Sequence, residues 1–229
     1  MALLLNIDTA TPVGSVCLSK DGQCVAEKIS TEQKDHAALV GPFIAELLAD
    51  TGIKGTELDA IAISGGPGSY TGLRVATSTA KGLCYAWQKP LIAVSTLAMM
   101  ASGIRAEWQG KKDPEAFYCP MIDARRMEVF TALYDSEWHV VVPPEAVVLD
   151  EHFLEAFQQR PVLIGGTGMP KAQRLFAAST AWQFVPHVSR AAHLIALAEQ
   201  AFAAGDFAEL AYFEPFYLKS VYLPGASKK

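Results

Sequence analysis

The second half of the chain repeats the pattern of the first half, and this repeat limits the folds open to the sequence. Each half begins with an apolar run that ends on an aspartate, at Asp8 and again at Asp123. Further along, residues 61–68 and 162–168 both pass from apolar residues into Gly-Gly-x-Gly. Matches that recur in the same order predict a duplicated fold of two similar lobes with a cleft between them.

Each half also carries the alternation and turn residues of an antiparallel meander. The expected strands are residues 3–8, 13–18 and 24–29 in the first half and 118–123, 127–134 and 138–142 in the second. Helices are predicted over 36–49, about 73–87 and 96–104, with further strands at 61–64 and 91–94. This alternation predicts an α/β fold in which each lobe is a mixed sheet flanked by helices.

A polar stretch near the middle of the chain is the best candidate for the lobe boundary. Residues 109–114 read Gln-Gly-Lys-Lys-Asp-Pro, a composition typical of loops. We therefore predict one lobe over residues 1–108 and a second over 109–229. The C-terminal tail is free to pack back on the first lobe.

Composition excludes several classes of protein. Half of the 229 residues are apolar, which is typical of a globular chain. The net charge of −5 argues against nucleic acid as a direct partner. Four cysteines without a Cys-x-x-Cys pair disfavour a zinc site and favour a reduced, cytoplasmic setting. The N-terminal sequence has no basic segment typical of a signal peptide, and no apolar run is long enough to span a membrane.

The glycine-rich run that follows the 61–64 strand has two interpretations. Glycines at a strand–helix junction let a backbone or an anion approach closely, so the run could be a functional loop. It could equally be a turn that needs glycine only to bend. No Lys-Ser or Lys-Thr follows Gly72, so the run is neither a Walker loop nor a dinucleotide fingerprint.

Three motifs carry a resemblance to a known family. They are Asn-Ile-Asp-Thr-Ala at 6–10, Gly-Pro-Gly-Ser-Tyr-Thr-Gly-Leu-Arg at 66–74 and Ile-Asp-Ala-Arg-Arg-Met-Glu-Val-Phe at 122–130. Strands ending in aspartate and Gly-Gly resemble the actin, hexokinase and Hsp70 superfamily. More narrowly, the motifs resemble the TsaB family, also called YeaZ, of the glycoprotease-like M22 group. The resemblance implies two actin-like, or ribonuclease H-like, lobes.

The resemblance also implies a function in making threonylcarbamoyladenosine in tRNA. It implies a non-catalytic subunit that binds and activates the TsaD-type transferase as a heterodimer, together with the TsaE-type ATPase. The chain would contact tRNA only indirectly, form a homodimer when alone, and have no membrane partner. The alternative is an enzyme of the actin fold, a kinase or ATPase that works in its own interlobe cleft.

Two aspartates and the glycine turns are the candidates for a nucleotide cleft. In the wider superfamily the positions that match Asp8 and Asp123 place a magnesium-bound nucleotide. The same aspartates could instead end their strands by accepting backbone N–H groups. We expect no resident cofactor and at most weak or vestigial ATP or ADP binding. The cleft residues are Asp8, Thr9, Gly65, Gly66, Asp123, Gly165, Gly166 and Gly168.

Histidine spacing predicts no metal site. The TsaD-type subunit holds a metal through two histidines four residues apart on its first helix. Here His36 has Val40 in the second position, and neither His-x-x-x-His nor His-Glu-x-x-His occurs in the sequence. His187 and His193 are six residues apart, a spacing that does not place them on one helix face.

The helices at 36–49 and 73–87 are predicted to form the partner interface. By resemblance they pair with the equivalent helices of TsaD, or of a second copy of this chain. The alternative is that their apolar stripes face only the core of the lobe. The predicted interface residues are His36, Leu39, Val40, Phe43, Leu47, Arg74, Thr77, Ser78, Lys81 and Tyr85.

Overall fold

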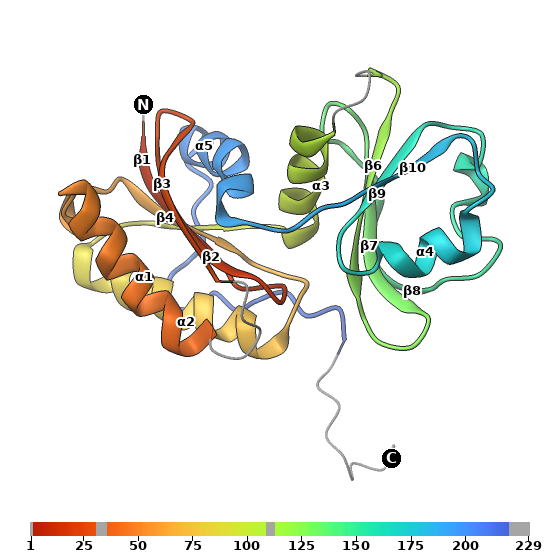
Figure 1. The fold of residues 1–229 in the computed structure, drawn as a ribbon. Helices are drawn as coiled ribbons and strands as arrows, with labels where there is room; N and C mark the ends of the chain where they lie inside the picture. The colour runs from red at the N-terminus through yellow and green to blue at the C-terminus, as the bar shows by residue number, and fades with distance from the viewer. Residues whose placement is uncertain (1, 31–35, 109–112, 220–229) are drawn as a thin grey trace, which may run out of the picture.

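Two five-stranded mixed sheets form the molecule. The computed structural model describes residues 2–30, 36–108 and 113–219, without the side chains of residues 36 and 37. The first sheet has the order β3-β2-β1-β4-β5 and the second the order β10-β9-β6-β7-β8. Read in reverse, the second sheet has the order β8-β7-β6-β9-β10. The first, second and third strands of each lobe, and then its fourth and fifth, therefore occupy the same places in the two sheets. The duplicated α/β fold predicted from the repeat is therefore confirmed (Figure 1).

The first half of the chain builds the first sheet and three α-helices. Within the sheet β1, β2 and β3 are antiparallel neighbours, while β4 and β5 run parallel to β1. The elements are β1 (Leu3–Asp8), β2 (Gly14–Lys20), β3 (Gln23–Ser30), α1 (His36–Thr51), η1 (Gly55–Glu57), β4 (Ala60–Ser64), α2 (Tyr70–Trp87), β5 (Leu91–Val94) and α3 (Thr96–Glu107).

The second half repeats the sheet with shorter helices. Here β6, β7 and β8 form the meander, and β9 and β10 run parallel to β6. The elements are β6 (Phe117–Asp123), β7 (Glu128–Tyr134), β8 (Val140–Val148), η2 (Glu155–Phe157), β9 (Val162–Gly165), α4 (Met169–Phe176), β10 (Trp182–Val185), η3 (Ala191–Leu194) and α5 (Ile195–Ala204).

One strand prediction is corrected. The sequence placed the third strand of the second meander at 138–142, whereas β8 begins at Val140 and continues to Val148. The preceding turn is longer than expected because Asp135 Oδ1 accepts the backbone N–H groups of Glu137 and His139, at 2.8 and 2.9 Å. Trp138 lies inside this turn with a positive φ of 69° and is not part of the strand.

Helices cover the sheets in three layers (Figure 1). On the outer side of the first sheet α1 and α2 pack on β2 and β4, and α4 packs on β6 of the second sheet. Between the sheets lie α3, which packs on β6 and β9, and α5, which packs on β5. Most buried residues of this middle layer belong to one cluster that includes Leu4, Ile92, Met100, Tyr118 and Leu194. The two sheets therefore share apolar core across the interlobe junction.

The chain after α5 lies against the first sheet. The backbone N–H of Ala208 donates to Leu91 O at 2.8 Å, and that of Phe216 donates to Gly65 O at 2.8 Å. Residues 220–229 of the predicted tail lie outside the described residues. The predicted boundary between residues 108 and 109 stays a prediction.

Candidate functional site

The first glycine turn is closed by the β1–β2 hairpin of its own lobe. Ser69 caps α2, its hydroxyl accepting the N–H of Gly72 at 3.2 Å. The hydroxyl of Thr9 donates to Gly72 O at 2.6 Å, and Ser69 N–H donates to Ala10 O at 2.7 Å. These bonds tie the end of β1 to the start of α2.

Glycine is required in this turn because other backbone segments lie against it. A Cβ at Gly72 would collide with Thr9 O, and one at Gly66 would collide with Phe216 O. Gly66 also has a positive φ of 113°, a conformation that side chains disfavour. The close approach that glycine allows here is thus to the protein's own backbone.

Asp8 also stabilises this closed turn. Its carboxylate is fully buried, and Oδ1 accepts the Ser64 hydroxyl at 2.6 Å and the Ala10 N–H at 3.0 Å. An aspartate that accepts the N–H two residues on stabilises a turn at the end of its strand. This geometry supports the structural interpretation of Asp8.

The matching aspartate of the second lobe has an open environment. The carboxylate of Asp123 is 45% exposed and accepts Lys171 Nζ at 2.7 Å and the Arg125 N–H at 2.6 Å. Burial raises the pKa of Asp123, but the hydrogen bonds from Lys171 and Arg125 outweigh it and lower the pKa below its usual value. A charged, exposed carboxylate remains available to solvent at this strand end.

The second glycine turn is packed against its own sheet. Gly168 N–H donates to Met121 O at 3.0 Å, and a Cβ at Gly166 would collide with Met121 O and with Met100 of α3. Gly165 lies against Ile104, also in α3. The structure thus places each aspartate beside the glycine turn of its own lobe. Their role in a nucleotide cleft stays a prediction.

The outer helices α1 and α2 contact each other and divide the predicted interface residues into core and surface. Val40, Leu47 and Thr77 are buried at 2%, 0% and 6% exposure, so the prediction is corrected for these three. Val40 and Leu47 belong to the apolar core that α1 and α2 form with the first sheet, and Thr77 is a buried polar residue of α2. Leu39 and Phe43 are half-buried. The His36 side chain lies outside the described residues.

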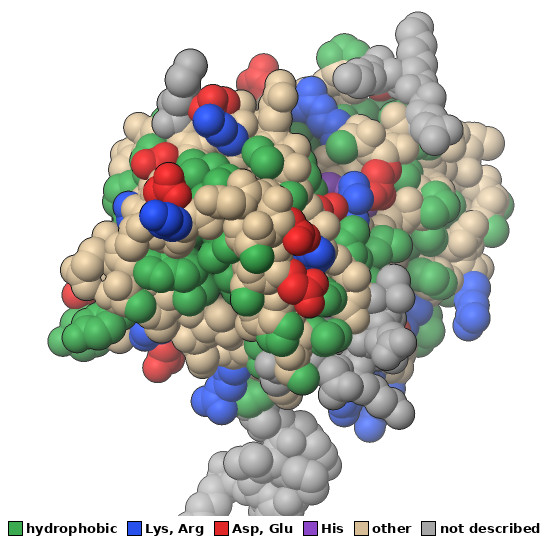
Figure 2. Space-filling view, turned by 60° about the vertical axis from the view of Figure 1, so that its left-hand side comes forward, with side chains coloured by type: hydrophobic (Ala, Val, Ile, Leu, Met, Phe, Trp, Pro, Cys, Tyr) green, Lys and Arg blue, Asp and Glu red, His purple; other side chains and the backbone are tan. Residues whose placement is uncertain are grey.

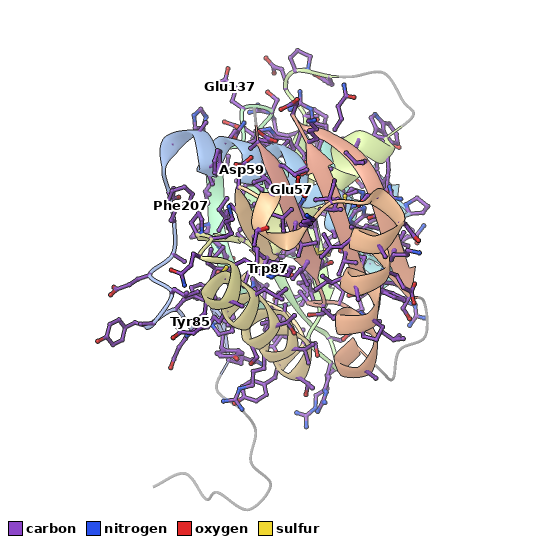
Figure 3. The ribbon with its side chains drawn as sticks, turned by 90° about the vertical axis from the view of Figure 1, so that its left-hand side faces the viewer. Glu57, Asp59, Tyr85, Trp87, Glu137 and Phe207 are labelled. Carbon is purple, nitrogen blue, oxygen red and sulfur yellow. The ribbon has the colours of Figure 1, made fainter. Side chains whose placement is uncertain are left out.

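On α2 the remaining interface residues reach the surface. Arg74 and Ser78 are exposed and Tyr85 is 75% exposed, as Figure 3 illustrates for Tyr85 at the end of the helix. Lys81 is half-buried, its Nζ donating to Ala211 O at 3.0 Å. Figure 2 shows this side of the molecule with apolar side chains grouped between charged ones.

The structure also brings together three residues that the sequence analysis did not group. Glu107 accepts His187 Nδ1 at 2.7 Å and lies 3.5 Å from His193 Nε2. Burial lowers the pKa of His193 to about 4. Burial would raise the pKa of Glu107, but the hydrogen bond from His187 and the electrostatic influence of His187, His193 and Arg190 lower it. Spacing along the chain contained no signal for this cluster, because 80 residues separate Glu107 from His187.

Comparison with known proteins identifies the family. Residues 23–220 match the family model of TsaD, tRNA N6-adenosine threonylcarbamoyltransferase. The TsaB protein of Escherichia coli strain K12 is 30% identical over 95% of this chain and 94% of its own length. This chain belongs to the TsaB family.

Other relatives agree with this assignment. TsaB of Bacillus subtilis is 33% identical over 71% of this chain and 70% of its own length. YeaZ from Pseudomonas aeruginosa, a solved structure, superposes with a TM-score of 0.77 at 31% identity. That alignment covers 95% of this chain and all of the P. aeruginosa chain. TsaB-family membership and the actin-like two-lobe fold predicted from the motifs are thereby confirmed.

None of the helices within residues 2–30, 36–108 and 113–219 is both long enough and apolar enough to cross a bilayer.

Proposed function

We propose that this TsaB-family chain is a non-catalytic subunit of the machinery that makes threonylcarbamoyladenosine in tRNA. It binds and activates the TsaD-type transferase, works with the TsaE-type ATPase and meets tRNA only through them, in the cytoplasm. The observation that carries the proposal is the match to E. coli TsaB over 95% of this chain and 94% of that protein. That relative is named as a tRNA threonylcarbamoyladenosine biosynthesis protein.

Two features support a role without catalysis. Asp8 and Thr9 use their oxygens to hold the chain's own glycine turn, through Ser64, Ala10 and Gly72. The sequence places Val40 where the TsaD-type metal pair would need a second histidine. Any binding of ATP or ADP near Asp123 would then be weak and would serve no reaction of this chain.

The outer face of α1 and α2 is the proposed docking surface. Its contact residues are Leu39, Phe43, Arg74, Ser78 and Tyr85, with His36 at the start of α1 and Lys81 at the margin. Side chains that are half-buried in the free chain can lose their remaining exposure in a helix–helix contact. A stable contact of this kind buries roughly 1,200–2,000 Å² in total. The homodimer would use the same surface, so TsaD and a second copy would compete for it.

The test is a complex measured by size exclusion with light scattering. The chain is mixed with its cognate TsaD-type transferase, and we expect one-to-one heterodimers to replace the separate species. Leu39→Asp should abolish the complex, because it places a charge in an apolar contact. Leu175→Asp is the matched control, since Leu175 is 46% exposed on α4 of the other lobe and should leave the complex intact.

Two outcomes would contradict the proposal. If Leu39→Asp unfolds the free chain, as seen by circular dichroism, the side chain belongs to the core and the docking surface is wrong. If the chain elutes alone and hydrolyses ATP, the enzyme alternative is correct. Loss of that hydrolysis in Asp123→Asn, with the fold intact, would place the reaction at the second lobe.

A further inference from the structure

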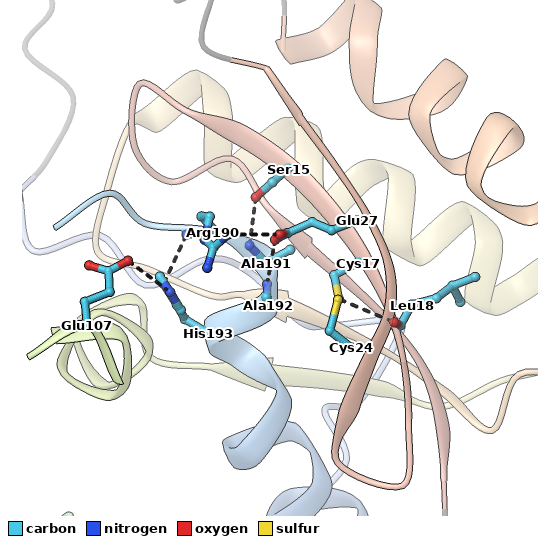
Figure 4. A network of polar contacts seen from close by, with 10 residues as sticks. All are labelled: Ser15, Cys17, Leu18, Cys24, Glu27, Glu107, Arg190, Ala191, Ala192 and His193. Atoms are coloured by element: carbon cyan, nitrogen blue, oxygen red, sulfur yellow. Dashed lines mark hydrogen bonds and ion pairs between the residues drawn. The ribbon is translucent and has the colours of Figure 1, made fainter. Parts of the chain in front are cut away.

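Among the described residues, two crossings between the lobes, one through α3 and one from β10 to η3, meet at one polar cluster. On the way out, α3 leads from β5 of the first sheet to β6 of the second and ends at Glu107. On the way back, the chain leaves β10, passes His187 and enters η3, which carries His193 and packs against both α3 and β2. Figure 4 shows His193 directed at Glu107 from the η3 side. The cluster therefore joins the outward crossing to the return crossing.

The three side chains already face one another at short range. His187 Nδ1 lies 2.7 Å from one oxygen of Glu107, and His193 Nε2 lies 3.5 Å from the other. Each of the three residues offers a ligand atom within 4.8 Å of the other two. In a tetrahedral zinc site with bonds of 2.0–2.1 Å, ligand atoms are about 3.3 Å apart. The two short distances run to different oxygens of Glu107, so side-chain rotations that bring one oxygen and both ring nitrogens to this spacing would close the set around an ion.

Burial distinguishes this cluster from an ordinary surface ion pair. The side chains of His187 and His193 are 0% and 6% exposed, and that of Glu107 is 30% exposed. His187 Nε2 is buried and has no hydrogen-bond partner among the residues that the structure describes. Nδ1 is the nitrogen of His187 that faces Glu107 and would bind an ion, so the burial of both rings beside one carboxylate, rather than this free nitrogen, marks the cluster as a candidate site.

We propose that Glu107, His187 and His193 form a binding site for one divalent transition-metal ion of the zinc type. Two imidazoles and one carboxylate are a ligand set that Zn²⁺ takes in proteins, with a fourth position left for water. The exposed part of Glu107 gives that water a route to the site. Coordination by His193 Nε2 places the ring proton on Nδ1, which gives up the 3.3 Å hydrogen bond now accepted from Arg190 N–H.

The consequence of binding is mechanical. An ion held by α3 and by the return crossing would fix these two segments to each other, and with them the relative position of the lobes. Arg190 and Ala192 already tie the return crossing to Glu27 of the first sheet, at 3.3 and 3.1 Å (Figure 4). The ion would extend this connection to the helix that packs on the second sheet.

The test uses the full, untagged chain, stripped of metal and titrated with Zn²⁺ and, for spectroscopy, with Co²⁺. We expect one ion per chain, a melting temperature that rises with Zn²⁺, and the visible absorption of tetrahedral Co²⁺. Glu107→Gln keeps the shape of the side chain and should weaken binding by at least the roughly 10–100-fold that loss of an outer-shell partner causes. His193→Ala should abolish the Co²⁺ spectrum.

His139→Ala and His152→Ala are matched controls, since these histidines are 70% and 69% exposed on the second lobe. Both should bind as the original chain does. The proposal is overturned if the original chain shows neither a Co²⁺ spectrum nor a rise in melting temperature. It is equally overturned if a control variant abolishes binding while Glu107→Gln leaves it unchanged. Because Glu107→Gln is nearly isosteric, its circular dichroism separates lost binding from lost folding.

Discussion

The two lobes have the same strand order but differ at the end of their central strands. In the first lobe Asp8 is fully buried beneath a glycine turn that the β1–β2 hairpin closes. In the second lobe the carboxylate of Asp123 is 45% exposed and pairs with Lys171. One sequence pattern, an apolar run ending in aspartate, therefore produces a fully buried carboxylate in one copy and a partly exposed, ion-paired carboxylate in the other.

The difference arises from the chain that follows each glycine turn. After the first turn comes the 18-residue helix α2, whose first turn is bonded to Thr9 and Ala10. After the second turn comes the 8-residue helix α4, whose Lys171 reaches back to Asp123 and to Glu128 O. The end of β1 is thus held in place by close backbone packing, and the end of β6 by a charged side chain.

The largest expected effect comes from breaking the closed turn of the first lobe. Gly72→Ala places a Cβ against the backbone oxygen of Thr9, which cannot move without displacing β1. We expect a loss of at least about 3 kcal/mol in the free energy of unfolding, measured by urea titration. Gly82→Ala, on the same helix with nothing within 4 Å of the new Cβ, should stabilise the chain by roughly 0.5–1 kcal/mol. Equal stability of the two variants would contradict this account of the turn.

The two aspartates offer a smaller, paired test. Asp8→Ala leaves the Ser64 hydroxyl and the Ala10 N–H without their buried acceptor and should lower the free energy of unfolding by about 2–4 kcal/mol. Asp123→Ala removes an ion pair whose carboxylate is 45% exposed and should cost about 1 kcal/mol, less than Asp8→Ala. Both values come from chemical denaturation at pH 7. If Asp123→Ala were the more damaging variant, the two strand ends would be more alike than their burial indicates.

Sequence reasoning was sufficient for the features that repeat. Alternation, turn residues and the recurring aspartate and Gly-Gly-x-Gly predicted two mixed sheets, because these patterns act locally and leave few ways to pair the strands. The motif at 66–74 indicated the family by resemblance, and the structure shows why it contains glycine, since Ala10 and Thr9 lie close against Gly68 and Gly72.

Features that depend on distant segments could not be predicted in the same way. Val40, Leu47 and Thr77 are buried because of the rotation of α1 and α2 about their axes as they pack, which periodicity alone does not determine. Glu107 meets His187 and His193 only because two crossings between the lobes meet there. No spacing rule applies to residues that the topology brings together over 80 positions.

The smallest expected effect is the pH dependence of the contribution that Asp123 makes to stability at the second strand end. Because the folded state lowers the pKa of Asp123, the ion pair stabilises the chain above the usual aspartate pKa of about 3.9. This contribution is lost as the pH falls through the lower, folded pKa, when Asp123 becomes protonated. Lys171→Met should therefore move the pKa of Asp123 back toward its ordinary value, as observed by NMR titration of the carboxyl carbon. The stability difference from the original chain should stay under about 1 kcal/mol at pH 7.

Lys20→Met removes the same charge from an exposed position at the end of β2 and should leave the titration of Asp123 unchanged. If Asp123 titrates identically in the original chain and in Lys171→Met, backbone hydrogen bonds alone hold its charge, and the second strand end is more like the first.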